Sequence, residues 1–462
     1  MRRLSGFDSA ALALETDSSP LHMTAVLLLD TSDVPGGYSY ERLRDFLAAR
    51  IHRVPPLLQR LVRVPAGVHR PVWVDAPSVD WGYHLPRMID TEPLDLQRLA
   101  EIAAERAEQR LDRGQPLWQI LVVEDPTGIR VALIACVHHA LMDGLGGMEF
   151  MASLFDLEPK EPRDEAPPEV EAPEAPSRLE LLARAVVDLT ALPVDGARFA
   201  LSSARTLANY AVGPSSDGQR APRPFTAPRT RFNAKLTPAR SVALTEVRFQ
   251  AVRDVAARNH ATVNDVVLTV VSGALRNYLF ARGLLPARRL IAGVPAATES
   301  AGAAFGNSFS FLLVRLATDV EDPQERLAVV KREAQRAKQS APLGMNGLTK
   351  LLDLFTPGPL DATIAAYRSL LVERIPPLWN VIVSNVPGPP VPLYVAGARL
   401  VGLFPLGPIY EGIGLNLTVI SREESLDVGI VACRESVPDV GDLAALLAPA
   451  LDELARSAAV HA

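Results

Sequence analysis

The 462-residue sequence has few cysteines, no large excess of positive or negative charge, and no long apolar run. Its two cysteines, Cys136 and Cys433, are too few for a disulfide framework or a cysteine-based zinc site. The net charge of −6 lacks the basic excess of a nucleic-acid-binding protein. No apolar run approaches the ~20 residues that span a bilayer, and the first residues lack the apolar segment of a secretory signal. We therefore expect a cytoplasmic protein that binds no nucleic acid.

The chain is long enough for two or three domains, and its composition changes near the middle. Residues 1–157 and 228–462 both mix predicted strands and helices, which permits a pseudo-symmetric pair of α/β halves. Residues 158–227 begin with a stretch rich in proline, glutamate and alanine. Such a stretch buries too little apolar surface to offset its ordering entropy, so we expect an exposed linker there.

Apolar periodicity predicts the elements of each half. In the first half we predict strands at 24–30, 72–75, 119–124 and 130–137, and helices at 40–51, 94–111 and 147–155. In the second half we predict strands at 290–295, 310–316, 378–384, 414–420 and 426–431, and helices at 266–279 and 440–457. Between the halves, 178–189 and 197–212 have the pattern of amphipathic helices. They either pack on a domain surface or turn an apolar face towards lipid or a hydrophobic substrate.

The strongest chemical signal is the segment 138–144, whose sequence is HHALMDG. The apolar run before it predicts a strand buried on both faces, so His138 and His139 stand where a core strand ends. In extended backbone their side chains point to opposite faces, so only one can face a reaction space. A neutral imidazole, with an ordinary pKa of about 6.5, accepts a proton near neutral pH. Asp143 can orient a histidine or the backbone through the turn, and Gly144 permits a tight bend.

A purely structural role, a metal site and a covalent nucleophile are all less favoured for this segment. In the structural role, Asp143 would cap a helix beside two core histidines. A metal site is disfavoured because no carboxylate cluster completes a ligand set and the remaining histidines lack ligand spacing. These are His22, His52, His69, His84, His260 and His461. No serine or cysteine stands in a nucleophile elbow, which argues against a covalent acyl-enzyme. The pattern therefore favours a histidine general base without a metal.

The segment 138–144 resembles the HHxxxDG signature of acyl-CoA-dependent acyltransferases, a superfamily that includes chloramphenicol acetyltransferase and peptide-synthetase condensation domains. Further stretches, from residue 4 to beyond 430, are similar to signatures of the bacterial wax ester synthase/diacylglycerol acyltransferases. They are Leu4-Ser5 with Asp8 and Glu15, PLHM at 20–23, PLW at 116–118, TVND at 262–265, NVIVSNVPGP at 380–389, PLYVAGA at 392–398 and GLN at 414–416.

This resemblance implies a chloramphenicol-acetyltransferase-like fold. Each half, 1–157 with the HHxxxDG segment and 228–462, would form a mixed sheet with flanking helices, and the active site would lie in the channel between them. It also implies that His139 is the general base, a choice that the residues alone do not make. His138 and Asp143 would then hold the geometry and Gly144 the turn. Acyl-CoA would be a co-substrate, with no bound cofactor.

The remaining candidate site residues come from three of these motifs: Pro116, Leu117 and Trp118; Asn264 and Asp265; and Asn385. The first motif can simply lock a strand start and fill the core. The second either shapes an acyl-CoA channel or, together with Thr262, caps a helix. Asn264 or a nearby backbone amide is also a candidate oxyanion donor. Asn385 begins a segment stiffened by three prolines, which favours a rigid interdomain loop over catalysis.

The resemblance implies transfer of a long-chain acyl group from acyl-CoA to diacylglycerol, forming triacylglycerol. A long-chain fatty alcohol, giving a wax ester, is the alternative acceptor. A catalytically inactive lipid-binding or scaffold protein is the alternative of another class, and the intact 138–144 segment argues against it. Ala296 and Arg434 depart from the family pattern, which bears on acceptor and acyl-chain preference. Because both products are insoluble in water, we expect peripheral contact with the inner membrane face or a lipid droplet.

Overall fold

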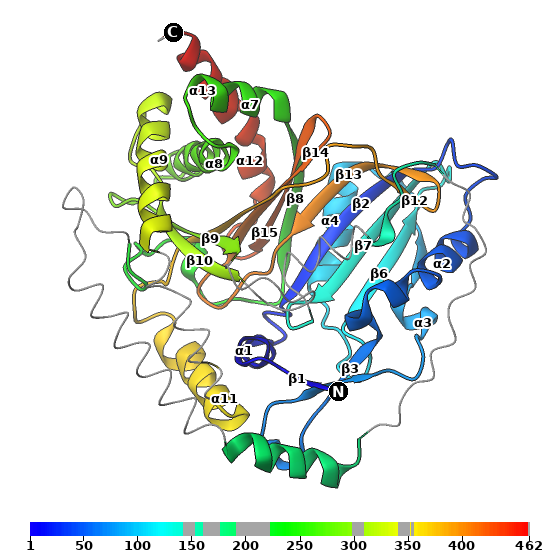
Figure 1. The fold of residues 1–462 in the computed structure, drawn as a ribbon. Coiled ribbons are helices and arrows are strands. Elements are labelled where there is room, and N and C mark those ends of the chain that lie inside the picture. The colour runs from blue at the N-terminus through cyan, green and yellow to red at the C-terminus, as the bar shows by residue number, and fades with distance from the viewer. Residues whose placement is uncertain are drawn as a thin grey trace.

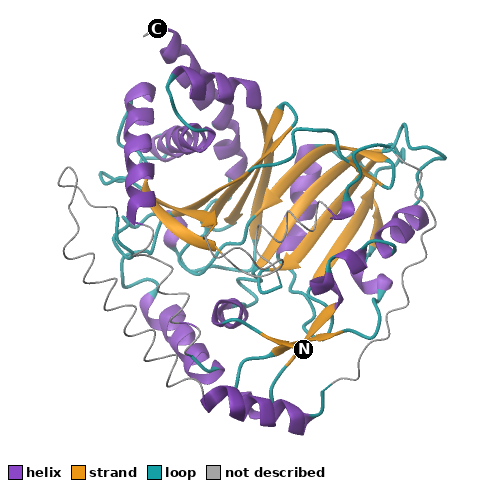
Figure 2. Ribbon diagram, viewed as in Figure 1, coloured by secondary structure: helices purple, strands orange, loops and turns teal. Residues whose placement is uncertain are grey.

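The computed structural model describes residues 1–141, 153–159, 176–190, 222–297, 309–340, 352 and 355–460. Two six-stranded sheets occupy the centre of the molecule, and a three-stranded sheet lies below them in the view of Figure 1. Helices cover the outer side of the second sheet at the upper left (Figure 2). The chain is therefore a mixed α/β protein with two sheet-rich halves, as predicted.

The first sheet has the strand order β12–β13–β2–β7–β6–β5. Its strands are β2 (His22–Asp30), β5 (Arg87–Ile89), β6 (Trp118–Glu124), β7 (Arg130–His138), β12 (Tyr394–Val395) and β13 (Ala398–Leu406). The helices of this half are α1 (Gly6–Leu14), α2 (Tyr40–Ala48), α3 (Trp81–His84) and α4 (Leu96–Ala107). β2 pairs antiparallel with β7 along its whole length, which places His22 opposite His138.

The centre of the first sheet is β7, which is apolar on both faces. Leu133 and Val137 belong to a buried cluster on one face, together with side chains of α1 and α2. Ala132 and Ile134 belong to a second cluster on the other face, with side chains of α4. All of β7 after its first residue is buried, so the prediction of a strand covered on both sides is confirmed.

The second sheet has the strand order β10–β9–β11–β14–β15–β8. Its strands are β8 (Arg240–Arg248), β9 (Ile291–Ala297), β10 (Phe309–Arg315), β11 (Val381–Val386), β14 (Leu415–Arg422) and β15 (Ser425–Cys433). Its helices are α7 (Phe249–Arg258), α8 (Val263–Phe280), α9 (Pro323–Ser340), α12 (Val440–Ala445) and α13 (Leu447–Val460). α8 lies against α7, α9 and α13 and is buried almost all round, because its sequence is apolar on every face.

A segment of the second half joins the first sheet. Residues 394–406 follow strand β11 of the second sheet, yet they form β12 and β13 of the first sheet, where β13 pairs antiparallel with β2. The division of the sequence at residue 228 assigned this segment to the second half. Apolar alternation can show that a segment forms a strand, but it does not show which sheet the strand joins. Sequence periodicity therefore could not predict that residues 394–406 belong to the first sheet.

A buried carboxylate and a glycine join the sheets where β13 crosses β15. The Asp427 side chain is fully buried and accepts a 2.8 Å hydrogen bond from the backbone N–H of Leu403 on β13. It also accepts a 2.7 Å bond from Arg422 Nε, which balances its charge. A Cβ at Gly429 would lie 2.1 Å from the carbonyl oxygen of Pro405. This approach of backbone to backbone requires a residue without a side chain.

The third sheet has the order β1–β4–β3, with β1 (Arg2–Arg3), β3 (Gln59–Val62) and β4 (Val72–Asp75). Residues 178–190 are helical, close to the predicted 178–189. Leu181 of this helix packs against Val72 and Val74. Of the two alternatives stated for this helix, packing on a domain surface therefore holds for the face that carries Leu181. The helix predicted at 197–212 lies outside the described residues, as does most of the one at 147–155.

The described chain contains elements that differ from the prediction. The predicted helix 440–457 is two helices, because α12 ends before Leu446 and α13 starts after it. α11 (Pro357–Ala366) packs on α1 and was not predicted. Strands β8 and β13 were also missed; β13 contains Pro405 and carries a register shift between Leu400 and Gly402 that interrupts its alternation.

Candidate active site

The histidine pair stands at the end of β7, and neighbouring strands hold its backbone. The N–H of His138 donates a 3.0 Å hydrogen bond to the carbonyl oxygen of Leu117, and the N–H of His139 donates one of 3.0 Å to that of Leu21. Leu21 has a φ of +53°, a left-handed conformation that a leucine adopts at an energetic cost. Leu21 is buried, so the surrounding contacts must hold its backbone in this conformation. Its carbonyl in turn supports the backbone of His139.

The side chain of His138 points inward and is uncharged. The N–H of Ala140 donates a 3.0 Å hydrogen bond to His138 Nδ1, so the ring proton of the neutral imidazole is on Nε2. Burial, together with the positive charges of Arg113 and Arg110, lowers the pKa of His138 to about 3. His138 is therefore a structural acceptor for the turn that follows it, rather than a base at neutral pH.

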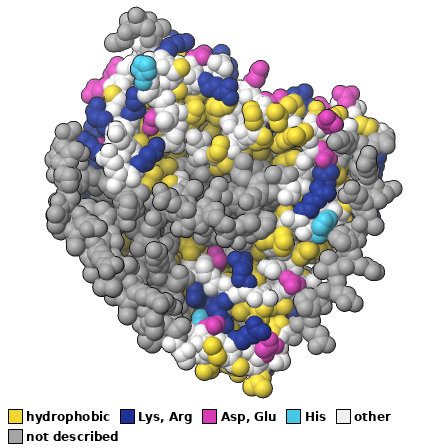
Figure 3. Space-filling model, in the orientation of Figure 1, with side chains coloured by type: hydrophobic (Ala, Val, Ile, Leu, Met, Phe, Trp, Pro, Cys, Tyr) yellow, Lys and Arg dark blue, Asp and Glu magenta, His cyan; other side chains and the backbone are white. Residues whose placement is uncertain are grey.

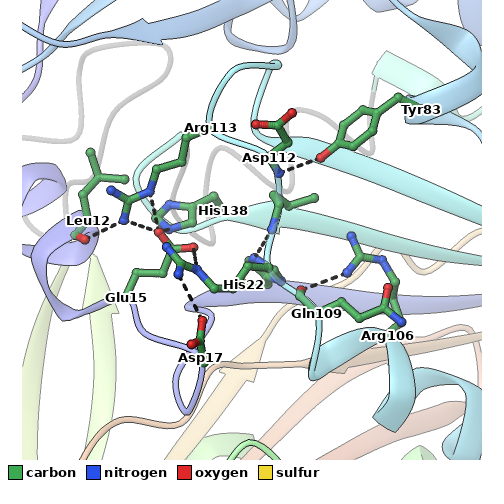
Figure 4. Close-up of polar contacts among 12 residues, drawn as sticks. Leu12, Glu15, Asp17, His22, Tyr83, Arg106, Gln109, Asp112, Arg113 and His138 are labelled. Carbon is green, nitrogen blue, oxygen red and sulfur yellow. Dashed lines mark hydrogen bonds and ion pairs between the residues drawn. The ribbon is translucent and has the colours of Figure 1, made fainter.

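A buried carboxylate faces His138. Glu15 follows the last turn of α1, and its side chain is fully buried. It accepts hydrogen bonds from Arg110 Nε at 3.0 Å and from Arg113 Nε at 2.6 Å. Figure 4 shows His138 turned towards this group, with its Nε2 atom 3.8 Å from a Glu15 oxygen. Since His138 is neutral, this approach orients the Nε2–H dipole towards the carboxylate and is not an ion pair.

A second buried histidine, His22, lies beside His138. His22 faces His138 across the paired strands, with ring centroids 6.0 Å apart. The backbone N–H of Leu111 donates a 3.4 Å bond to His22 Nε2 (Figure 4). Burial above all, and then electrostatic repulsion by His138, Arg106 and Arg110 of a proton on His22, hold the pKa of His22 well below its ordinary value. Neither His22 nor Glu15 was placed in the candidate site from the sequence, although both occur in the stretches between residues 4 and 23 that are similar to family signatures.

His139 directly follows the last residue of β7. It is buried, and its ring centroid is 6.0 Å from that of Phe7 on α1. Asp143 and Gly144, the other predicted members of the motif, lie outside the described residues. Among the described residues, no group of three or more His, Cys, Asp or Glu side chains is placed to hold a metal ion.

A small hollow of about 20 Å³, open to solvent and lined in part by His22, lies between the halves. Its lining includes Leu21 and Thr24 from the first half, the segment 406–409, and Arg240. Arg240 is buried and donates hydrogen bonds to the carbonyl oxygens of residues 237–239 and of Ser18. The hydrogen bonds of its guanidinium group thus join residues of the two halves and stabilise their junction.

The match to known proteins covers nearly the whole chain. The profile of the wax ester synthase/diacylglycerol acyltransferase catalytic domain matches residues 4–267, and that of the WS/DGAT C-terminal domain matches residues 305–455. The chain belongs to this acyltransferase family. The family predicted from the sequence motifs is therefore confirmed, and so is the enzyme class, an acyl-CoA-dependent acyltransferase.

Relatives and solved structures agree with this assignment. A Mycobacterium tuberculosis protein named as a diacylglycerol O-acyltransferase is 35% identical over 98% of this chain and 90% of its own. One from Mycobacterium bovis is 31% identical over 98% of both chains. The wax ester synthase/diacylglycerol acyltransferase of Marinobacter aquaeolei is 25% identical, with a TM-score of 0.69 over 99% of this chain and 100% of its own. The first condensation domain of the CDA synthetase shares the fold, with a TM-score of 0.57 at 17% identity over 99% of this chain and 96% of its own.

Within this acyltransferase, the PLW motif lies directly beside the histidine pair. Pro116 precedes β6, and the carbonyl of Leu117 holds the backbone of His138. The indole N–H of Trp118 donates a 2.8 Å bond to the carbonyl of Leu57, and its ring stacks on His84 with centroids 4.2 Å apart. All three motif residues are buried. Their contacts fix the start of β6 and fill the core, as the structural interpretation expected.

The ND and NVP motifs lie in the second half. Asp265 accepts a 2.9 Å bond from the N–H of Thr262, and Thr262 accepts one from that of Asp265, so this pair forms the capping box of α8. Asn264 is half-buried in the first turn of the same helix. Asn385 lies near the end of β11, in the second sheet, opposite Val419 of β14. Asn264 and Asp265 thus lie in a helix of the second half and Asn385 in a strand of the second sheet, whereas the histidine pair stands at the end of a strand of the first sheet.

Proposed function

We propose that the protein transfers a long-chain acyl group from acyl-CoA to diacylglycerol, giving triacylglycerol and free CoA. The observation that carries this proposal is the set of relatives named as diacylglycerol O-acyltransferases, 31–35% identical over 98% of the chain or more. The geometry at the end of β7 supports it, because His138 is neutral and its Nδ1 accepts a hydrogen bond within the turn, which makes His139 the candidate base. No bound cofactor or metal takes part in the proposed reaction.

In the proposed mechanism His139 is the general base. It takes the proton of the acceptor hydroxyl while the oxygen attacks the thioester carbonyl, forming a tetrahedral intermediate. The intermediate collapses to the ester, and the departing CoA sulfur recovers the proton from the imidazolium. His138, through its bond to Ala140, and Asp143 and Gly144 in the following turn would hold the base in place. Acyl-CoA and the acceptor would meet in the channel between the halves.

A long-chain fatty alcohol is the second candidate acceptor, and its product would be a wax ester. The specific support is the similarity to the Marinobacter protein, whose name includes wax ester synthase and whose structure matches 99% of this chain. Both acceptors present a primary or secondary hydroxyl on a long apolar body, so a single base can serve both. The choice between them depends on the shape of the apolar channel rather than on the histidine pair.

Thiol release from acyl-CoA by the purified protein tests this function. We expect release that depends on diacylglycerol, less with a long-chain fatty alcohol, and none without acceptor. A general base contributes about 10²–10⁴-fold to rate, so His139→Ala should lower turnover by that factor. Full turnover in this variant would refute the mechanism. No acceptor-dependent release under any condition would favour the binding or scaffold protein.

The acceptor and product are insoluble in water, so we propose that the protein works at the cytoplasmic face of a membrane or at a lipid droplet. In the part of the chain that the structure describes, no helix is both long enough and apolar enough to cross a bilayer. Contact with lipid would therefore use side chains exposed at the protein surface, and sedimentation with vesicles measures it directly.

A further inference from the structure

The end of the molecule that carries the three-stranded sheet has an unusual surface. We call it the basal surface and define it by residues 1–3, 59–75 and 177–190, which form β1, β3, β4 and the helix 178–190. Five of the large apolar side chains that are exposed in the described chain lie here: Met1, Val68, Leu179, Val186 and Val187. Exposed large apolar side chains are thus concentrated in a small part of the chain.

The helix 178–190 has two apolar faces, and only one of them is used for packing. Leu181 and Ala185, four residues apart, are buried against the small sheet. Leu179, Val186 and Val187 lie on another face of the helix, where they are 77%, 60% and 68% exposed. Packing on the small sheet therefore accounts for the first face and leaves the second face in contact with water.

The charge of the basal surface has the opposite sign to that of the chain. Its three segments contain seven arginines against Asp75, Glu180 and Asp188, whereas the whole chain has a net charge of −6. Two of these acidic side chains are already paired within the surface, Asp188 with Arg3 at 2.6 Å and Glu180 with Arg184 at 2.9 Å. Figure 3 shows dark-blue basic side chains, together with some magenta acidic ones, among yellow apolar side chains at the lower end of the molecule. An excess of positive charge around exposed aliphatic side chains matches an anionic lipid surface.

The basal surface connects to the histidine pair through α1. The chain passes directly from β1 into α1, whose Phe7 lies against the His139 ring. α11 packs on α1 and is followed by Leu370 and Leu371, which are 53% and 42% exposed. Exposed apolar side chains therefore occur near both β1 and α11, the two elements that adjoin α1. Helix α1 in turn contacts His139 through Phe7.

We propose that the basal surface docks on an anionic lipid surface, with Leu179, Val186 and Val187 inserted among the acyl chains and the surrounding arginines at the headgroups. This inference rests on the proposed function, because it identifies where the water-insoluble acceptor is met. The docking surface is thus formed by helix 178–190 and the three-stranded sheet on which this helix packs.

The test is sedimentation of the full-length protein with vesicles of phosphatidylcholine containing about 30 mol % phosphatidylglycerol, compared with phosphatidylcholine alone. The test variant is Leu179→Glu/Val186→Glu/Val187→Glu. The matched control is Phe280→Glu/Leu284→Glu, which changes side chains that are 69% and 46% exposed at the end of α8 in the other half. We expect at least about a tenfold loss of vesicle binding in the test variant and none in the control. A second variant, Arg63→Ser/Arg178→Ser, should weaken the preference for phosphatidylglycerol.

Thiol release with the acceptor dispersed in detergent separates this inference from the proposed function. The test variant should retain the wild-type rate there, which also shows that it is folded. If vesicle binding is lost as expected but neither protein releases CoA, the docking surface stands and the function fails. Unchanged vesicle binding in the test variant would overturn the docking surface. A wild-type dimer that the test variant converts to a monomer would also overturn it, since a second copy would then be the occupant.

Discussion

The buried Glu15 carboxylate gives a sharp test of how the histidine pair is held. Glu15→Gln keeps the size and shape of the side chain but removes its charge, and it turns an amide N–H₂ towards arginine donors. The Glu15 side chain is fully buried, whereas Arg110 and Arg113 remain 40% and 25% exposed. Because these arginines keep part of their hydration, we place the loss below that of a completely buried pair, at about 2–4 kcal/mol.

The expected loss can be converted into a melting temperature. With an unfolding entropy of about 2 cal/mol/K per residue, a chain of this size changes its Tm by about 1 °C per kcal/mol. Glu15→Gln should therefore lower the Tm by about 2–4 °C. Differential scanning calorimetry measures this shift. The same variant should also lower the rate of CoA release, because His138 loses the carboxylate that its Nε2–H faces.

Asp17→Asn is the matched control. Asp17 pairs with the same Arg110 at 3.1 Å, but its side chain is 86% exposed, and exposed pairs contribute about 0–1 kcal/mol. This variant should melt within about 1 °C of the wild type. A Glu15→Gln protein with the Tm and turnover of Asp17→Asn would refute the argument that the buried carboxylate positions His138. Lower turnover at an unchanged Tm would show that its role is positional alone.

Three further predictions concern the histidines and the junction between the sheets. His139→Ala should lower turnover by about 10²–10⁴-fold in the thiol-release assay while leaving the Tm unchanged within about 2 °C. Because burial lowers the pKa of His138 from 6.5 to about 3, the unfolded state binds its proton first as the pH falls. The free energy of unfolding, measured with urea, should therefore be fully retained above pH 6.5 and fall by about 1.4 kcal/mol per pH unit below it through this group. Gly429→Ala places a Cβ 2.1 Å from the carbonyl oxygen of Pro405 and should cost at least about 1–3 kcal/mol, measured in the same way.

Each of these predictions has a control or a contrary outcome. His139→Ala with wild-type turnover would assign the base elsewhere. The pH effect requires His138 to be neutral, so a His138→Gln variant should show a shallower fall between pH 6.5 and pH 4 than the wild type, and an equal slope would contradict it. Gly441→Ala is the control for Gly429→Ala, because a Cβ there meets nothing within 4 Å. Equal stability of these two variants would mean that β13 and β15 can separate without cost.

Local patterns predicted local structure well. The apolar run at 131–137 predicted a strand covered on both faces, because burial on both sides leaves no polar position in the alternation. The spacing of Thr262 and Asp265 predicted the capping box at the start of α8, since both partners of a cap lie within four residues. In both cases the physical cause lies within one element, which is why the sequence contains its signal.

Long-range arrangements could not be predicted in this way. The pairing of Glu15 with Arg110 and Arg113 joins residues nearly a hundred positions apart, and polar side chains in irregular segments have no period. The left-handed backbone of Leu21 is imposed by its surroundings, because leucine has no intrinsic preference for it. The motif resemblance singled out the neighbourhood of both residues, but their roles follow only from the fold.

The position of β13 in the first sheet has a consequence for folding during translation. Until residues 398–406 have left the ribosome, β2 has no partner on one side, so the first sheet has an open edge throughout most of translation. An open apolar edge invites pairing with other chains, and a protein truncated before residue 394 would keep that edge permanently. The carboxy-terminal part of the gene therefore completes the amino-terminal sheet, and neither half can be expected to fold as an independent fragment.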